Sequence, residues 1–194
     1  MNKKKVLNLI FNIVIIVGLV LSCLIFAFKL SFVKVVVNGT SMNPTIDNGT
    51  VGYMVKVNKN TKIERFDVVA SKYLDEEGSY IIKRVLGLPN EEVKLVDNTL
   101  YVNGNEIPQE FSFIPRNLNF SETSWTLQED EYLLVGDNRA ATINPVVEKK
   151  EEIISKNGFA IYTYDINSSS CENHKDYSGC EIDNRKWYYL KDGK

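Results

Sequence analysis

The chain begins with one long apolar stretch and continues with short apolar runs separated by polar turns. Val6 to Phe28 contains no charged residue. A helix of this length would measure roughly 34 Å, which is enough to cross a hydrocarbon layer of about 30 Å. Lysines occupy positions 3–5, and basic residues are typical of the cytoplasmic side of such helices. The pattern predicts residues 1–5 in the cytoplasm, a transmembrane anchor over residues 6–28 and an extracytoplasmic domain over residues 29–194.

A cleavable signal peptide is the alternative interpretation of the same stretch. The apolar region of a signal peptide usually has about 7–15 residues and is followed by a small-x-small cleavage site. The stretch in this chain is longer, and no such site follows it. Lys29 and Lys34 reduce the charge asymmetry across the stretch, but an uncleaved anchor remains the expected state.

The region after the anchor consists of short runs of β-branched and aromatic residues bounded by Gly, Asn, Asp or Pro. Such runs are typical of β-strands. Glu148 to Ser155 is the one stretch after the anchor that could form a helical turn. The expected fold class is mainly β: one N-terminal transmembrane helix followed by a single domain built on an antiparallel β-sheet. The expected strands are 32–37, 51–57, 66–70, 80–86, 92–96, 99–102 and 131–135.

Charge and cysteine content narrow the functions to consider. The chain has 25 acidic and 23 basic residues, so it offers no basic field for a nucleic acid. It has one histidine and no clustered Cys/His/carboxylate spacing, so no metal or other cofactor is expected. Cys171 and Cys180 could close a small loop by a disulfide in an oxidising compartment, and two free thiols are the alternative. Cys23, inside the apolar stretch, is expected to be a small apolar filler.

Two residues outside the anchor could form a catalytic pair. A serine hydroxyl needs a base, and a lysine can act as that base only when its surroundings lower its pKa of about 10.4. Lys83 lies in the apolar run Tyr80 to Leu86, where the two-residue period of a strand places it on the same face as Ile81. Ser41 lies in the turn-like segment Gly39 to Thr45. Taken alone, an exposed lysine and a turn serine remain the alternatives.

Four sequence blocks in a fixed order resemble the bacterial type I signal peptidases (leader peptidases, peptidase family S26), in particular those of the Gram-positive kind. Behind an N-terminal anchor, members carry Ser-Met-x-Pro-Thr, an Arg-Gly-Asp-Val-Val-like block, a Lys-Arg-Val-x-Gly-Leu-Pro-like block and Gly-Asp-Asn-Arg. The resemblance covers roughly residues 1–142 and gives no support for the C-terminal region. The matching blocks in this chain are Ser41–Thr45, Arg65–Val69, Lys83–Glu91 and Gly136–Arg139.

The resemblance implies a membrane-bound serine endopeptidase that removes signal peptides from secretory preproteins after an Ala-x-Ala sequence. It implies Ser41 as the nucleophile, Lys83 as the general base and the backbone N–H of Ser41 as an oxyanion donor. Some members carry a second donor, a serine, at the position of Gly39. The preprotein is expected to add as an extended strand beside the strand of Lys83. The family's small-residue pockets correspond to residues for which core packing is the alternative. These are Val37, Met42, Ile46, Ile81 and Ile82.

The last block departs from the family pattern. Members continue into x-x-Ser-x-Asp-Ser-Arg, whereas this chain reads Ala140 to Val146 without those residues. Thr142 stands where a serine orients the lysine amine, and a threonine hydroxyl can make the same hydrogen bond. Asn144 and Val146 replace an acid and an arginine, so the supporting ion pair of that segment is expected to be absent. The retained supporting residues of the block are Asp137 and Arg139.

Three other functions remain open. The altered last block fits a catalytically weak or idle relative, an anchored extracellular assembly or binding module for exported surface proteins. The retained Ser41 and Lys83 argue against it. A self-cleaving regulator like the SOS repressors shares the serine–lysine dyad, but its DNA-binding helix-turn-helix is absent from this sequence. A Ser-His-Asp hydrolase would need His174, which lies in a polar, loop-like stretch.

Four aromatic residues lie in a region without a strong strand pattern. Aromatic side chains are common where a protein meets the lipid interface. We therefore expect either a membrane-facing patch or core burial for Phe111, Phe113, Phe120 and Trp125.

Overall fold

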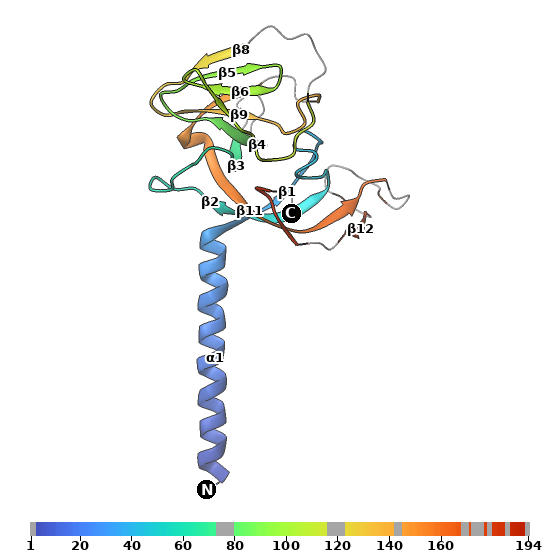
Figure 1. Cartoon of the computed structure of the whole chain (residues 1–194). Helices are drawn as coiled ribbons and strands as arrows, with labels where there is room; N and C mark the ends of the chain where they lie inside the picture. Colours follow the sequence, from blue (N-terminus) through green and yellow to red (C-terminus); the bar gives the residue numbers. More distant parts are fainter. Residues whose placement is uncertain are drawn as a thin grey trace.

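A long helix projects from a β-rich domain (Figure 1). The computed structural model describes residues 3–72, 80–115, 123–141, 145–167, 171, 177, 180–184 and 187–192. Helix α1 runs from Lys3 to Ser31, and none of its residues is buried. Among the described residues it is the one helix that is long and apolar enough to cross a membrane. It contains the whole segment 6–28 for which an anchor is expected.

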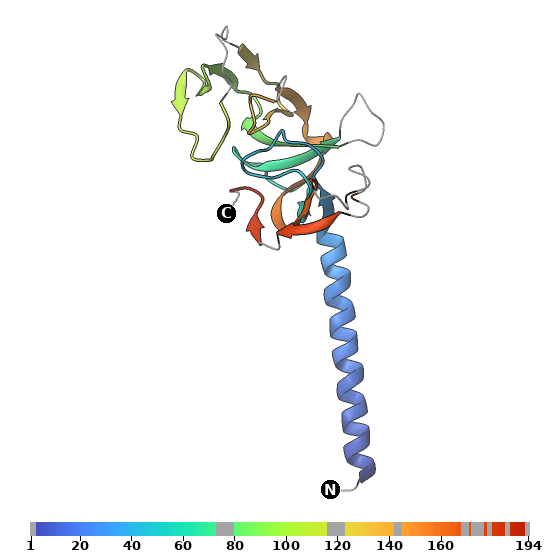
Figure 2. The same ribbon diagram turned by 90° about the vertical axis from the view of Figure 1, so that its right-hand side faces the viewer.

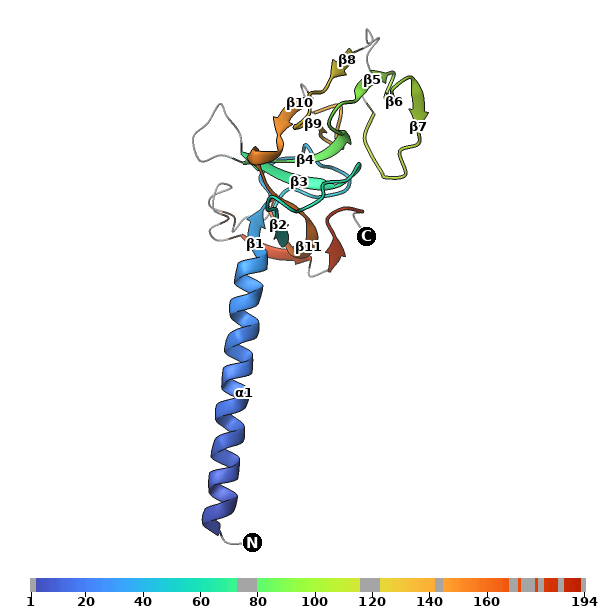
Figure 3. The ribbon, with the colours of Figure 1, turned by 90° about the vertical axis from the view of Figure 1, so that its left-hand side faces the viewer.

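Two antiparallel sheets make up the domain. In the described part of the chain, the larger sheet has nine strands: β1 (Phe32–Val36), β2 (Thr50–Lys56), β3 (Val68–Lys72), β4 (Tyr80–Gly87), β9 (Glu131–Val135), β10 (Val146–Lys149), β11 (Ile153–Asp165), β12 (Glu181–Asn184) and β13 (Tyr188–Tyr189). Their order is β1-β2-β11-β3-β4-β9-β10, and β12 and β13 also pair with β11. The smaller sheet has β5 (Glu92–Val96), β6 (Thr99–Val102), β7 (Asn105–Ile107) and β8 (Thr123–Thr126) in the order β7-β6-β5-β8. It lies at the end of the domain farthest from α1 (Figures 1 and 3).

The expected mainly β, antiparallel fold is confirmed. All seven expected strands are present, and β5, β6 and β9 have the expected bounds. Glu148 to Ser155, read as a helical turn, contains only a short 3-10 helix from Lys150 to Glu152 between β10 and β11. The strands missing from the sequence interpretation are β7, β8, β10, β11, β12 and β13.

The sequence interpretation missed strand β11 because its residues Asn157 and Gly158 are typical of a turn. Asn157 and Gly158 adopt positive φ angles of 47° and 115°, yet the strand continues across them with a shift of register between Lys156 and Phe159. A Cβ atom on Gly158 would lie 2.0 Å from the carbonyl oxygen of Tyr53, so only glycine permits this approach to β2. The pair bends the strand instead of ending it, and β11 pairs with both β2 and β3.

Strand β1 begins directly where α1 ends. The ring of Phe28 in α1 stacks on Phe32 of β1 with centroids 4.7 Å apart, and it meets Tyr53 of β2 edge-on at 5.1 Å. Figure 2 shows the orange and red strands of the C-terminal region beside the top of the helix. The helix end is therefore packed against the larger sheet.

Cys171 and Cys180 form a disulfide, which is one of the two states that the sequence leaves open. The third cysteine, Cys23, is free and exposed on α1. His174, the one candidate base of the Ser-His-Asp alternative, lies outside the described residues.

Candidate active site

A groove of about 380 Å³ lies between β1 and the start of β4. Both Ser41 and Lys83 line it. Its apolar walls come from β1, β3, β4 and β11, through residues that include Val33, Val35, Ala70, Ile81, Ile82 and Ile154. The two residues expected to form the catalytic pair therefore share one apolar groove.

Two strand edges face this groove without a partner strand among the described residues. β1 pairs only with β2. β4 pairs with β3 from Tyr80 to Arg84, but its other edge meets β9 only from Arg84 onward. Residues 80–83 and strand β1 thus offer free backbone N–H and C=O groups on both sides of the groove, and an extended peptide could pair with either edge.

Ser41 is held in a turn that is tied to the loop after β9. The backbone N–H of Asn138 donates to the carbonyl of Ser41 at 3.0 Å, and the Asn138 side-chain amide donates to the carbonyl of Thr40 at 3.1 Å. On the other side, Gly39 N–H donates to Asn48 Oδ1 at 2.9 Å. These bonds fix the backbone around a half-buried serine whose side chain lines the groove.

Lys83 is an amine with a perturbed proton affinity. Burial lowers the pKa of Lys83 to about 8, and the negative charge of Asp137 opposes part of that shift. Within the described ranges, no carboxylate forms an ion pair with the Lys83 amine. A lysine in this setting has a substantial neutral fraction near pH 8 and can accept a proton.

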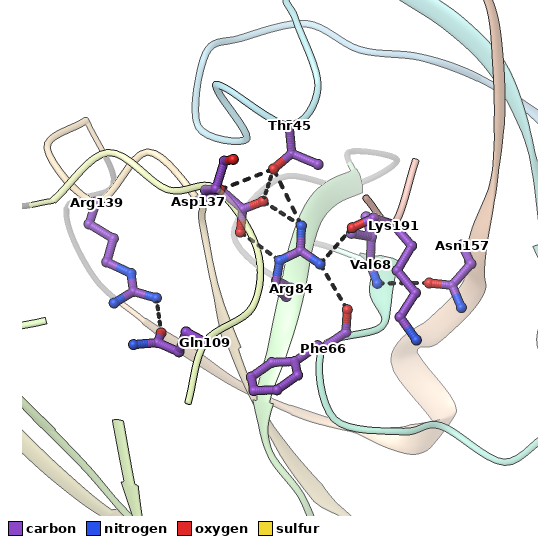
Figure 4. Close-up of polar contacts among 10 residues, drawn as sticks. Thr45, Phe66, Val68, Arg84, Gln109, Asp137, Arg139, Asn157 and Lys191 are labelled. Atoms are coloured by element: carbon purple, nitrogen blue, oxygen red, sulfur yellow. Dashed lines mark hydrogen bonds and ion pairs between the residues drawn. The ribbon is translucent and has the colours of Figure 1, made fainter. Parts of the chain in front are cut away.

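Arg84, the next residue, is surrounded by acceptors (Figure 4). Its side chain is 1% exposed, and it donates through Nε and Nη2 to the two oxygens of Asp137 at 2.8 and 2.6 Å. Nη1 donates to the carbonyls of Phe66 at 2.9 Å and Lys191 at 2.8 Å. Asp137 also accepts a hydrogen bond from the hydroxyl of Thr45. A paired guanidinium of this kind can stay charged in the interior.

The sequence interpretation expected one of the two adjacent cations to point into a buried face and chose Lys83. The structure places Lys83 with Ile81 at the groove, as expected, and adds that Arg84 is the more deeply buried of the two cations. Thr45 and Arg84 were not assigned a supporting role at all. The sequence contained evidence for the role of Arg84. Two neighbouring cations in a strand point to opposite faces, and a buried arginine requires an acid such as the retained Asp137.

Asp137 and Asn138 connect the two halves of the candidate site. Asp137 holds Arg84, the residue that follows Lys83 in β4, and it also holds Thr45 in the turn of Ser41. Asn138 binds that turn directly through the carbonyl of Ser41. The position of Ser41 relative to Lys83 is therefore set by this short loop.

Arg139 contributes to the fold and not to the groove. It is buried, its guanidinium stacks on the ring of Phe113 at 4.1 Å, and it donates to the carbonyl of Asn98 at 2.9 Å and to the side chain of Gln109. Burial lowers the pKa of Arg139 to about 10. Figure 4 shows it apart from the Arg84 cluster.

Of the two alternatives for the aromatic residues, packing against the domain is what the structure shows for Phe111, Phe113 and Trp125. Phe111 lies under the guanidinium of Arg84 at 4.1 Å and Phe113 under Arg139. Trp125 belongs to β8 and packs on the core of the smaller sheet, at the end of the domain far from α1 (Figure 1). Phe120 lies outside the described residues.

The other expected site residues divide into three groups. Val37, Met42, Ile81 and Ile82 line the groove together with Gly39. Ile46 is 0% exposed, belongs to the core cluster beneath the turn and is not among the residues that line the groove. Thr142 and Asn144 lie outside the described residues, while Val146 begins β10 opposite Leu134.

Comparison with known proteins identifies the family. Residues 6–143 match the family model described as signal peptidase, peptidase S26. The chain belongs to this family. Membership makes it a peptidase that removes signal peptides, and the N-terminal apolar helix is consistent with membrane anchoring.

Two signal peptidases of Bacillus species agree with this assignment. Signal peptidase I V of Bacillus subtilis (strain 168) is 35% identical over 121 residues, which cover 56% of this chain and 71% of the relative. Signal peptidase I of Bacillus licheniformis is 31% identical over 141 residues, which cover 67% and 73%. A crystal structure of a signal peptidase I from Enterococcus faecalis V583 is similar with a TM-score of 0.40 and 26% identity, and the match covers 48% of this chain and 94% of that one.

Proposed function

We propose that this signal peptidase cuts secretory preproteins with Ser41 as the nucleophile and Lys83 as the general base. The observation that carries the proposal is that both residues line one apolar groove, in which burial lowers the pKa of Lys83 to about 8. A neutral amine there can take the proton of the Ser41 hydroxyl as its oxygen attacks the scissile carbonyl.

The reaction then follows the acyl-enzyme route. The backbone N–H of Ser41 donates to the oxyanion of the tetrahedral intermediate, and Gly39 supplies no side-chain donor. The Lys83 ammonium gives its proton to the leaving amine, and the neutral amine next activates the water that hydrolyses the ester at Ser41. In this scheme Thr142 accepts or donates the hydrogen bond that orients the amine.

The preprotein binds as an extended strand between the free edges of β1 and β4. The apolar walls, which include Met42 and Ile82, suit alanine methyl groups, because these groups gain free energy by leaving water. This geometry supports cleavage after Ala-x-Ala. Among the residues expected to form the substrate pockets, we assign this role to those that line the groove, and Ile46 is not one of them.

The lipid bilayer is the second partner in this proposal. We place α1 across the membrane with its N-terminus in the cytoplasm, because three lysines precede the apolar segment. Aromatic side chains surround the other end of the helix, where Trp187, 69% exposed, stacks on Phe159 at 5.4 Å and Phe159 contacts Phe32 and Tyr53. Aromatic residues are typical of the membrane surface, so the domain rests at the outer interface.

The test is cleavage of a preprotein that carries an Ala-x-Ala site by the full chain in detergent. Ser41→Ala and Lys83→Ala should each reduce kcat by about 10³-fold or more, and replacing the last alanine of the site by leucine should prevent cleavage. Ser124→Ala is the matched control, because this serine is exposed on β8 of the smaller sheet.

Different failures point to different conclusions. Cleavage that survives Ser41→Ala would overturn the mechanism. A folded but inactive parent protein would favour the alternative that the altered last block allows, an anchored binding module for exported proteins. Cutting after leucine as fast as after alanine would leave the dyad intact and remove the proposed specificity.

A further inference from the structure

A buried tyrosine links the disulfide loop to the groove. Tyr177 lies between Cys171 and Cys180 in the sequence and is 5% exposed. Its ring stacks on Tyr164 of β11 with centroids 5.1 Å apart and planes 8° apart. Burial raises the pKa of the Tyr177 phenol, so the hydroxyl is protonated and available as a donor at neutral pH.

The Tyr177 hydroxyl has two acceptors at the end of β1. It donates to the carbonyl of Val37 at 2.6 Å and lies 3.3 Å from Oδ1 of Asn48. The same Val37 carbonyl accepts the N–H of Gly49 at 2.9 Å. One side chain from the C-terminal region therefore braces the point where the first strand turns toward the nucleophile.

One acceptor belongs to a residue of the groove, and the other is bonded to the turn of Ser41. Val37 lines the groove, and Asn48 Oδ1 also accepts the N–H of Gly39 at 2.9 Å. Gly39 is two residues before Ser41 and has a φ of 120°, a conformation that glycine adopts readily and that other residues avoid. A shift of Tyr177 would thus change the positions of the groove wall and of the turn that carries the proposed nucleophile.

The disulfide holds Tyr177 in place. The residue has a φ of 59°, a left-handed conformation that is unfavourable for a bulky side chain and persists only where the surroundings enforce it. The bond between Cys171 and Cys180 closes the loop, and Cys180 N–H donates to the Tyr177 carbonyl at 3.2 Å. Reducing the disulfide would remove this restraint on Tyr177 and so on its stacking with Tyr164.

We propose that Tyr177, held by the Cys171–Cys180 disulfide, is a positioning residue for the preprotein groove, so that substrate binding depends on the oxidation state of this disulfide. The inference rests on the proposed function, because it concerns the same groove. Reduction by a dithiol such as dithiothreitol breaks the S–S bond and gives two cysteine thiols. The dithiol supplies two electrons and two protons and becomes a cyclic disulfide.

The first test is Tyr177→Phe, which removes the hydroxyl and keeps the ring stack. We expect KM for an Ala-x-Ala preprotein to rise about five- to tenfold, the effect of losing one or two hydrogen bonds. kcat should change less than twofold, and the pH midpoint set by Lys83 should not move. Tyr164→Phe is the matched control, because it removes the other hydroxyl of the same stack, whose hydrogen-bond partner is the hydroxyl of Tyr162.

The second test is the disulfide itself. Dithiothreitol should raise KM of the parent protein by a similar factor and should not change KM of the Cys171→Ser/Cys180→Ser variant, which should already have the raised value. Tyr177→Phe should respond little to dithiothreitol, since the restrained hydroxyl is already absent.

The outcomes separate this inference from the proposed function. An active parent protein whose KM is unchanged by Tyr177→Phe overturns the positioning role and leaves the dyad untouched. A fall in kcat with constant KM, or a loss that follows a lower melting temperature, also overturns it. A rise in KM for Tyr177→Phe without any effect of dithiothreitol overturns the dependence on the disulfide. A parent protein that cuts no preprotein overturns the proposed function instead.

Discussion

Lys83 and Arg84 are neighbours in β4, yet they lie in opposite surroundings. Arg84 is fully buried and meets both oxygens of Asp137 and two backbone carbonyls. Lys83 faces the groove without an ion-pair partner among the described residues, and burial lowers its pKa to about 8. The two buried cations thus have different surroundings, because a carboxylate and backbone carbonyls hold the guanidinium, whereas no carboxylate of the described residues forms an ion pair with the Lys83 amine. One strand combines a charge that organises the fold with an amine suited to proton transfer.

The largest expected effect comes from removing the amine and keeping the strand. Lys83→Met should lower kcat by about 10³-fold or more, because no base remains for Ser41. Its melting temperature should stay the same or rise, since a half-buried amine is replaced by an apolar chain of similar length. Lys72→Met, an exposed lysine in β3, is the control for kcat. If Lys83→Met instead lowered the melting temperature and kept the activity per folded molecule, Lys83 would serve the fold and not the reaction.

Breaking the pair of Arg84 should act on stability first. Asp137→Asn leaves an uncompensated buried guanidinium and should reduce the free energy of unfolding by about 3–5 kcal/mol, measured by urea denaturation. Replacing both partners, in Arg84→Met/Asp137→Leu, should recover part of this loss, because no buried charge is left. A loss below about 1 kcal/mol for Asp137→Asn would show that the pair does not organise the fold.

The pH dependence of kcat/KM tests the state of Lys83 directly. The base must be neutral, so activity is low below pH 7, rises through the pKa of about 8 and levels off above about pH 9. The neutral fraction grows about tenfold between pH 7 and pH 9 for such a group. The midpoint should lie lower in any Asp137→Asn protein that remains folded, because the Asp137 charge raises the pKa of Lys83. A midpoint near the ordinary lysine value would contradict the comparison.

The smallest effect is expected at an exposed ion pair. Lys62 and Glu64 are 3.0 Å apart with side chains 83% and 53% exposed. Lys62→Ala should change the free energy of unfolding by less than about 0.5 kcal/mol, because water and salt screen such pairs. The same urea titration at low and high salt measures it. A larger change than that of Asp137→Asn would mean that burial is not what distinguishes the two ion pairs.

Much of the fold could be predicted from local patterns. The anchor and the early strands have clear apolar runs with turn residues at their ends, and β5, β6 and β9 were located to the residue. β11 was missed because Asn157 and Gly158 resemble a turn, whereas contacts with β2 hold the chain extended through them. The paths of β12 and β13 depend on pairing with β11, so they could not be found before it.

The site could be predicted in part for a similar reason. Ser41 and Lys83 follow from sequence blocks, and the structure brings both to one groove. The partners that place them are distant in sequence: Asp137 reaches Arg84 and Thr45 across the sheet. Ile46 shows the opposite limit, because an apolar residue near a nucleophile can belong to the core as easily as to a pocket.

The direct passage from α1 into β1 limits how far the proposed site can lie from the end of the helix. β1 has five residues, and at about 3.3 Å per residue the strand can carry the groove up to roughly 16 Å above the helix end. With α1 across the bilayer as proposed, a preprotein strand running along β1 must leave the membrane by about five extended residues before its scissile bond reaches Ser41. Under the proposed function, the length of β1 therefore limits the distance between the hydrophobic segment of a preprotein and its cleavage point.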